Sequence, residues 1–313
     1  MRSVPITMRL VRCFVIASIG AVTLAGCAPS ATAPISAPSA GFGHIHGLGV
    51  DPASGDLFVA THRGVWRIDA GYLDRPSSTA ASEQVAGRSQ DTMGFTIAGP
   101  DLMFASGHPD PANNPEQSPP NLGLVESRDG ASSWKTVSLA GETDFHDLVT
   151  TPLKGDGSPL RIYGYDAGHQ TIMISDDAGT TWQDRSTIAL RKLAVNASAP
   201  DVVYATTASG LQVSRDAGRT FTIVPNAPQL LLIDAVNTNP GSFIGADVDG
   251  VIWSTDDSAS TWQQRGTLDS PPEAMTYVAD AEKPWILASD NRGVVASFDF
   301  GKNWIVLIPG ASR

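Results

Sequence analysis

One octapeptide decides the fold: Ser175-Asp176-Asp177-Ala178-Gly179-Thr180-Thr181-Trp182. Residues 214–221 repeat it as Ser-Arg-Asp-Ala-Gly-Arg-Thr-Phe, and less complete copies occupy residues 127–134, 255–262 and 297–304. A short apolar run precedes every copy, and these runs begin at Gly123, Thr171, Gly210, Gly250 and Gly293. A sixth apolar run begins at Gly64 and has no copy after it. Successive runs are separated by 59, 48, 39, 40 and 43 residues, and a period of about 40 is that of a four-stranded structural unit.

The octapeptide resembles the Asp box, the S-x-D-x-G-x-T-W turn of sialidase-like β-propellers. Its residues suit a tight turn, because aspartate can accept backbone N–H bonds and glycine adopts backbone angles that a Cβ forbids. The resemblance implies that each box joins the third and fourth strands of a blade and is structural, through Asp129, Asp177, Asp216, Asp257 and Asp299. We expect the aromatic residues that end the boxes to be buried between blades: Trp134, Trp182, Phe221, Trp262 and Trp304.

Two more apolar runs precede each of the six, as residues 46–50 and 57–60 do in the first repeat. The repeats fill residues 42–309, and no long helical periodicity is present. We therefore predict an all-β fold, a six-bladed β-propeller. A seventh blade would have to come from residues 70–92, which must also supply the outer strand of the first blade. A closed ring leaves only short, protected strand edges, and we expect a monomer.

The composition is that of an acidic, turn-rich globular protein. The chain has 313 residues, of which 42% are hydrophobic and 17% charged, with 30 glycines and 22 prolines. Its net charge of -11 argues against a nucleic-acid partner, which would require a basic face.

The N-terminus is expected to direct export. Residues 1–26 contain three arginines and an apolar run, and they end in Leu24-Ala25-Gly26 directly before Cys27, a pattern that resembles the signal peptide of bacterial lipoproteins. The resemblance implies a lipid on Cys27, a tether over 27–41 that is rich in Ala, Pro and Ser, and one propeller domain over 42–313. It also implies a membrane-anchored extracellular protein, on the outer side of the cytoplasmic membrane or in the periplasm. The whole chain is similar to Asp-box (BNR repeat) lipoproteins of bacteria that are often labelled glycosyl-hydrolase-like.

All six histidines fall at equivalent places in the first three repeats: His44, His46, His62, His108, His146 and His169. They occupy the start of a first strand or the loop between second and third strands. These two places lie at the same end of an antiparallel blade, so we expect every histidine on one rim of the ring. His44 and His46 are two residues apart on a strand and should point the same way.

A metal site is one interpretation of this rim. We expect His46, His146 and one of His62, His108 or His169 to converge. Imidazoles suit copper, zinc, nickel or iron, and a thioether such as Met93 favours copper, so copper or zinc is the expected ion. Asp144, Asp147 and Asp166 are close enough to ligate the ion or to hydrogen-bond a ligand. The alternative is that the histidines line a polar channel mouth and only bond loop backbone.

Other function classes remain open. A sialidase-like glycoside hydrolase would need an arginine cluster and an F-R-I-P motif, but the nearest string, Leu160-Arg-Ile-Tyr163, lacks the proline. A generic glycosidase needs two carboxylates, for which the rim offers Asp144, Asp147, Glu273 and Asp290. Residues 107–121 are an insertion in a loop of the same face, and two interpretations are open: a cap over the mouth or a tolerated surface loop. We favour a non-catalytic protein whose histidine-rich face binds a metal, a small molecule, a glycan or another protein; an assembly scaffold is the third alternative.

Replacement of Cys27 by serine should abolish lipid attachment and move the protein out of the membrane fraction, because serine cannot form the thioether to the lipid. Fractionation of cells that produce the wild type or Cys27→Ser measures this. Equal retention of both proteins in the membrane fraction would show that Cys27 is not the anchor.

Overall fold

The computed structural model describes residues 41–73, 82–110, 119–154, 159–279 and 284–310. The expected signal peptide, Cys27 and the tether up to residue 40 lie outside the described residues, as does most of the insertion, 111–118. No described helix has the length and apolar character that a bilayer crossing requires. The described residues belong to the compact unit that spans Ala37–Arg313.

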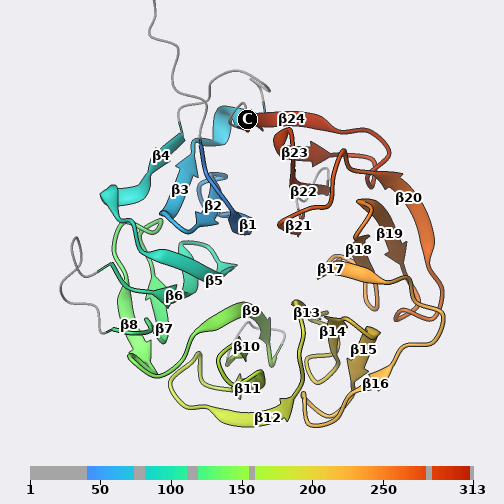
Figure 1. The fold of residues 1–313 in the computed structure, drawn as a ribbon, viewed down its shortest axis with the longest axis horizontal. Helices are drawn as coiled ribbons and strands as arrows, with labels where there is room; N and C mark the ends of the chain where they lie inside the picture. Colours follow the sequence, from blue (N-terminus) through green and yellow to red (C-terminus); the bar gives the residue numbers. More distant parts are fainter. Residues whose placement is uncertain (1–40, 74–81, 111–118, 155–158, 280–283, 311–313) are drawn as a thin grey trace, which may run out of the picture. The chain divides into compact units, whose positions relative to one another are not determined.

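Six four-stranded sheets, the blades, follow one another around a ring (Figure 1). Blade one contains β1 (Ile45–Val50), β2 (Leu57–Thr61), β3 (Gly64–Ile68) and β4 (Ser82–Gln84). Blade two contains β5 (Asp91–Gly99), β6 (Leu102–His108), β7 (Leu124–Ser127) and β8 (Lys135–Ser138). Blade three contains β9 (Phe145–Pro152), β10 (Leu160–Asp166), β11 (Thr171–Ser175) and β12 (Gln183–Thr187). Blade four contains β13 (Lys192–Val195), β14 (Val203–Thr207), β15 (Gly210–Ser214) and β16 (Thr222–Ile223). Blade five contains β17 (Leu230–Ala235), β18 (Phe243–Asp247), β19 (Val251–Thr255) and β20 (Gln263–Thr267). Blade six contains β21 (Met275–Val278), β22 (Trp285–Asp290), β23 (Gly293–Ser297) and β24 (Ile305–Pro309).

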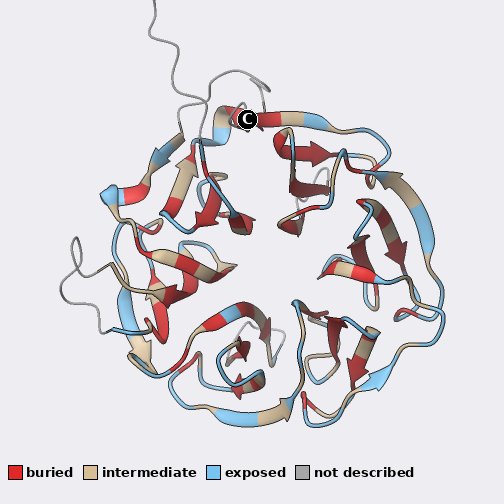
Figure 2. Ribbon diagram, in the orientation of Figure 1, coloured by how far each residue is buried: buried red, intermediate tan, exposed pale blue. Residues whose placement is uncertain are grey.

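Each blade is an antiparallel meander of consecutive strands, which confirms the predicted all-β, six-bladed propeller. The segment over residues 70–92 supplies no seventh blade. Its described part forms the 3-10 helices η1 (Ala70–Tyr72) and η2 (Val85–Gly87), strand β4, and the start of β5. The inner strands carry most of the buried residues and the outermost strands are largely exposed, as Figure 2 shows.

The repeated octapeptides form the turns between the third and fourth strands, as predicted. In the turn of blade three, Asp177 Oδ1 accepts hydrogen bonds from Thr181 N at 2.8 Å and from Ser175 Oγ at 2.8 Å. Its Oδ2 accepts one from Thr181 Oγ1 at 2.7 Å. Gly179 has φ +88°, and a Cβ there would lie 2.1 Å from Leu124 of blade two, so glycine allows the blades to approach. Asp216 accepts equivalent bonds in blade four. They lower its pKa to about 2, and the hydrogen bond from the Thr220 hydroxyl is the largest cause.

The aromatic residues that end these turns are half-buried, which corrects the expectation that they would be buried: Trp134, Trp182, Phe221, Trp262 and Trp304. Each packs against the apolar cluster between its own blade and the preceding one. The physical reason for their partial exposure is that each turn leads into the outermost strand of its blade, where one edge of the ring meets solvent.

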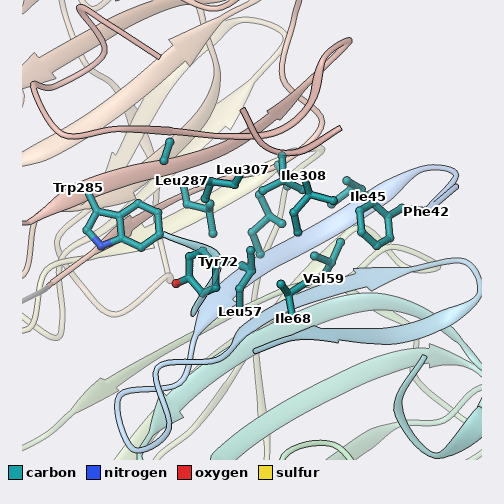
Figure 3. Packing of buried hydrophobic residues seen from close by; sticks show 14 residues of the cluster. Phe42, Ile45, Leu57, Val59, Ile68, Tyr72, Trp285, Leu287, Leu307 and Ile308 are labelled. Atoms are coloured by element: carbon teal, nitrogen blue, oxygen red, sulfur yellow. The ribbon is translucent and has the colours of Figure 1, made fainter. Parts of the chain in front are cut away.

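Blades six and one close the ring by side-chain packing. Every sheet consists of strands consecutive in the sequence, so within the described residues no strand from one end of the chain completes a sheet at the other. Trp285, Leu287, Leu307 and Ile308 of blade six instead form one buried cluster with residues of blade one (Figure 3). The blade-one members labelled there are Ile45, Leu57, Val59 and Ile68, together with Phe42 and Tyr72. A hydrogen bond of 2.9 Å from Ile45 N to Glu273 Oε2 also crosses this interface.

Trp182→Ala should lower the free energy of unfolding by about 3 kcal/mol, because a half-buried indole is lost from between two blades. The Trp182 ring lies 4.8 Å from that of Phe145, and its Nε1 donates to Ser138 Oγ at 2.9 Å and to Gly179 O at 3.0 Å. Trp304 differs, because its buried Nε1 has no hydrogen-bond partner among the described residues. Trp182→Phe should therefore lower the free energy of unfolding by about 1 kcal/mol more than Trp304→Phe does. Urea unfolding measures all three. A loss below about 1 kcal/mol for Trp182→Ala would contradict the interblade role.

Candidate metal centre

The six histidines occupy one end of blades one to three. His44 precedes β1 and His46 lies on it, His62 follows β2, His108 ends β6, His146 lies at the start of β9, and His169 follows β10. Because strands alternate in direction within a blade, the starts of first strands and the ends of second strands share one end. The sequence-based placement of the histidines on one rim therefore agrees with the strand topology.

A channel runs between the first strands of the blades. A cavity of about 670 Å³ is lined by residues of all six first strands. At the histidine end it shares residues with a second hollow of about 230 Å³, whose lining includes His44, His46, Met93, His146, Arg191 and Glu273. His44, His46, His146 and Met93 therefore line a concave mouth at this end of the channel.

β-Bulges set the side chains at this mouth. His46 is the extra residue of a bulge in β1, and Met93 and His146 occupy the equivalent bulges of β5 and β9. A bulge turns a side chain away from the regular alternation of a strand and is frequent next to binding sites. The three bulges thus place one histidine, one methionine and one histidine at equivalent positions of neighbouring blades.

Three imidazoles converge at blade one: His44, His46 and His62 each offer one nitrogen, and the three atoms lie within 4.8 Å of one another. His46 Nε2 lies 3.2 Å from His62 Nε2, and the His44 and His46 rings are 4.6 Å apart between centroids. His44 and His46 therefore lie together, as expected. His146 was expected in this group, but its Nε2 instead bonds Asp144 Oδ2 at 2.7 Å.

A carboxylate orients one of the three rings. His62 Nδ1 lies 2.8 Å from Asp91 Oδ1, a hydrogen bond in which Nδ1–H donates. His46 Nε2 lies 3.3 Å from His62 Nδ1 and 3.2 Å from His62 Nε2, and this tautomer leaves the lone pair of His62 Nε2 free for a metal ion.

The electrostatics of the mouth keep His46 neutral. Burial is the largest cause that lowers the pKa of His46 to about 4, and the neighbouring His62 and His44 lower it further. His146 behaves in the opposite way, since its hydrogen bond with Asp144 raises its pKa. An uncharged imidazole is the form that ligates a metal, so His46 is ready to bind at neutral pH.

The two other predicted histidines, His108 and His169, lie in different surroundings. His108 lies between two carboxylates, with Nδ1 3.4 Å from Asp91 Oδ2 and Nε2 3.5 Å from Asp144 Oδ2. His169 is separate from the other five: it is 76% exposed and bonds Asp166 Oδ2 at 2.7 Å.

Three of the carboxylates that the sequence suggested for catalysis or metal binding are paired with other groups: Asp147, Glu273 and Asp290. Asp147 is buried, forms an ion pair with Lys192 and accepts a hydrogen bond of 2.6 Å from Leu193 N. Asp290 forms an ion pair with Arg292. Glu273 accepts the bond from Ile45 N across the ring closure. Each of these three side chains thus has a charged or hydrogen-bonding partner outside the histidine group.

Sequence reasoning missed Asp91, although a signal was present. Residues 44–47, 91–94 and 144–147 read His-Ile-His-Gly, Asp-Thr-Met-Gly and Asp-Phe-His-Asp. His46, Met93 and His146 were matched, and the residue two places earlier gives His44, Asp91 and Asp144. An alignment of all three strings would have placed Asp91 on the rim.

The depressed pKa of His46 predicts how stability depends on pH. Between pH 6.5 and 4 the unfolded chain binds a proton at this residue that the folded chain does not, so the wild type should lose stability relative to His46→Gln as the pH falls. His146→Gln should show the opposite sign, because its raised pKa stabilises the wild type as the pH falls. Urea unfolding in metal-free buffer at pH 7 and pH 5 measures both differences. Changes of the same sign for the two variants would contradict these opposite environments.

No family model matches the chain, and no curated protein matches it. Solved structures match its fold. An ancestral GH74 enzyme aligns with a TM-score of 0.52 at 14% identity, over 83% of this chain and 37% of its own. The GH74 xyloglucanase from Xanthomonas campestris aligns with a TM-score of 0.52 at 18% identity, over 86% of this chain and 46% of its own. A chain of a nidogen–laminin complex aligns with a TM-score of 0.55 at 12% identity, over 78% of this chain and 89% of its own. This chain therefore has the β-propeller fold of GH74 glycoside hydrolases while it spans less than half the length of those two enzymes.

Proposed function

We propose that this chain is a metal-binding β-propeller whose ion is held by His44, His46 and His62. The observation that carries the proposal is the approach of three imidazole nitrogens to within 4.8 Å of one another at a concave mouth.

The spacing of the donors suits a small transition-metal ion. Ligands about 2.0–2.1 Å from a tetrahedral ion are separated from each other by about 3.3 Å. The distance of 3.2 Å between His46 Nε2 and His62 Nε2 is close to that value. His44 is exposed, so a small rotation of its ring can complete the set. Three protein ligands would leave a fourth position for water or for a bound molecule.

The identity of the ion follows from the donor chemistry. Three imidazoles accept copper or zinc, and among divalent ions copper binds most tightly to such donors. Met93 lines the same hollow as His44 and His46, and its thioether would favour the cuprous ion. Asp91 would support the site by holding His62 through Nδ1.

The position in the cell is part of the proposal. The sequence of residues 1–26 and Cys27 supports export and lipid attachment, which would place the metal centre outside the cytoplasmic membrane or in the periplasm. A lipid on Cys27 would keep the propeller, as a monomer, near the membrane surface.

Binding is proposed rather than catalysis. The GH74 likeness concerns the fold, and fold alone does not carry an activity. The candidate carboxylates have the partners described above: Asp147, Glu273 and Asp290. Arg292 forms an ion pair with Asp290. The mouth remains suited to a small molecule or glycan that occupies the open position of the metal ion.

Calorimetric titration of untagged protein with Cu(II) and Zn(II) at pH 7 tests the proposal. His46→Ala and His62→Ala should each weaken binding at the three-histidine site at least 10-fold, because a two-imidazole site remains. Bound metal should also raise the melting temperature of the wild type, since it binds the folded ring and not the unfolded chain.

His169→Ala is the matched control, because His169 lies apart from the cluster, and its affinity should equal that of the wild type. Affinities weaker than millimolar, or affinities equal in the wild type, His46→Ala and His62→Ala, would contradict the proposal.

A further inference from the structure

A second group of metal-ligating side chains continues around the same rim. His108 from the end of β6 and His146 from the start of β9 both approach Asp144, which immediately precedes β9. His108 Nε2 is 3.5 Å and His146 Nε2 is 2.7 Å from the same oxygen, Asp144 Oδ2. Two neighbouring blades thus direct two imidazoles at one carboxylate.

The carboxylate of Asp144 is short of partners. Its side chain is only 13% exposed, and its other oxygen, Oδ1, is buried without a hydrogen-bond partner among the described residues. A buried carboxylate oxygen that accepts no hydrogen bond is costly, and a bound cation is one group that satisfies it. This observation is independent of the histidines and points to a positive ligand at Asp144.

We propose that His108, Asp144 and His146 bind a second metal ion, adjacent to the one proposed at His44, His46 and His62. The inference rests on the proposed function in that it extends that metal centre to two ions. Two imidazoles and one carboxylate form a donor set that suits Zn²⁺ and other borderline divalent ions.

His146 Nε2 hydrogen-bonds Asp144 Oδ2 at 2.7 Å and would exchange this bond for the ion, whereas the position of His108 already fits a metal ligand better than a hydrogen-bond partner. A separation of 3.5 Å between His108 Nε2 and Asp144 Oδ2 is longer than a good hydrogen bond. It is close to the roughly 3.3 Å that separates two ligands of one tetrahedral ion. His108 is 45% exposed and His146 37% exposed, so both rings are free to make the small adjustments that binding requires.

Asp91 connects the two sites. Its Oδ1 lies 2.8 Å from His62 Nδ1 and its Oδ2 lies 3.4 Å from His108 Nδ1. In both rings the nitrogen that faces Asp91 is Nδ1, which leaves Nε2 to face the ion. One carboxylate therefore orients one ligand of each site, and its removal should weaken both.

The net charge of the donors distinguishes the sites. The first site has three neutral imidazoles, whereas the second contains the Asp144 carboxylate. A carboxylate favours harder divalent ions, and soft cuprous ion prefers nitrogen and sulfur donors. We therefore expect Zn²⁺ to occupy both sites and Cu(I) to occupy the first alone.

The test is the number of Zn²⁺ ions bound by the full chain, measured by calorimetric titration and by metal analysis after dialysis against micromolar Zn²⁺. The wild type should bind two equivalents. Asp144→Asn should bind one, with the remaining affinity within about 3-fold of the wild-type first site, since the amide keeps the shape of the carboxylate but loses its charge. His108→Ala tests the same site at an exposed residue and should also bind one Zn²⁺ equivalent. Asp91→Asn should weaken both equivalents about 10-fold or more.

The first site is followed separately with His46→Ala, which should lose the other equivalent. His169→Ala serves as control and should keep both. The melting temperatures of the metal-free proteins establish that each variant is folded.

The outcomes separate the two proposals. One equivalent in the wild type that is lost in His46→Ala and kept in Asp144→Asn overturns the second site and leaves the first. Two equivalents retained in both Asp144→Asn and His108→Ala also overturn the second site. Loss of one Zn²⁺ equivalent in Asp144→Asn, with the number of equivalents unchanged in His46→Ala, supports the second site and overturns the first. Absence of any Zn²⁺ binding tighter than millimolar overturns both.

Discussion

Apolar packing between neighbouring blades is the interaction on which the rest of the structure depends. The backbone pairing of strands stays within each sheet, so the blades are joined by six apolar clusters, one for each interface, and by side-chain bonds such as that of Asp147 Oδ2 with Leu193 N. Five interfaces receive an aromatic residue from an octapeptide turn. The sixth joins blades six and one, where the aromatic residues buried in the cluster are Phe42, Tyr72 and Trp285. The spacing of the first strands, and with it the width of the channel mouth, follows from this packing.

The repeat keeps the scaffold uniform while the channel mouth varies. Octapeptide turns recur in blades two to six, whereas histidines occur in blades one to three only. The bulge residue of the first strand is histidine in blades one and three, methionine in blade two and leucine, Leu231, in blade five. The residue at this bulge therefore differs from blade to blade, and in blade five Leu231 packs against the apolar cluster between blades five and six.

Imidazoles and carboxylates alternate around the histidine side of the mouth. From His62 the order is Asp91, His108, Asp144 and His146, each within 3.5 Å of the next. The pKa values of two histidines of this mouth are shifted in opposite directions, by burial first in His46 and by a hydrogen bond in His146. His46 faces other imidazoles in a buried position and its pKa falls, whereas His146 faces Asp144 and its pKa rises. A metal ion would replace the proton as the positive charge in such an arc.

The sequence by itself determined the architecture, because each blade is built from contacts within about 40 consecutive residues and one octapeptide marks the turn of five of them. It also determined that the histidines share one rim, since strand direction alternates in every blade. Only the tertiary structure decided which side chains meet. The grouping of His44, His46 and His62, the place of His146 beside Asp144, and the role of Asp91 all depend on bulges and on the rotation of one blade against the next. Local sequence does not encode these, because the rotation is set by side chains that pack across the blade interfaces.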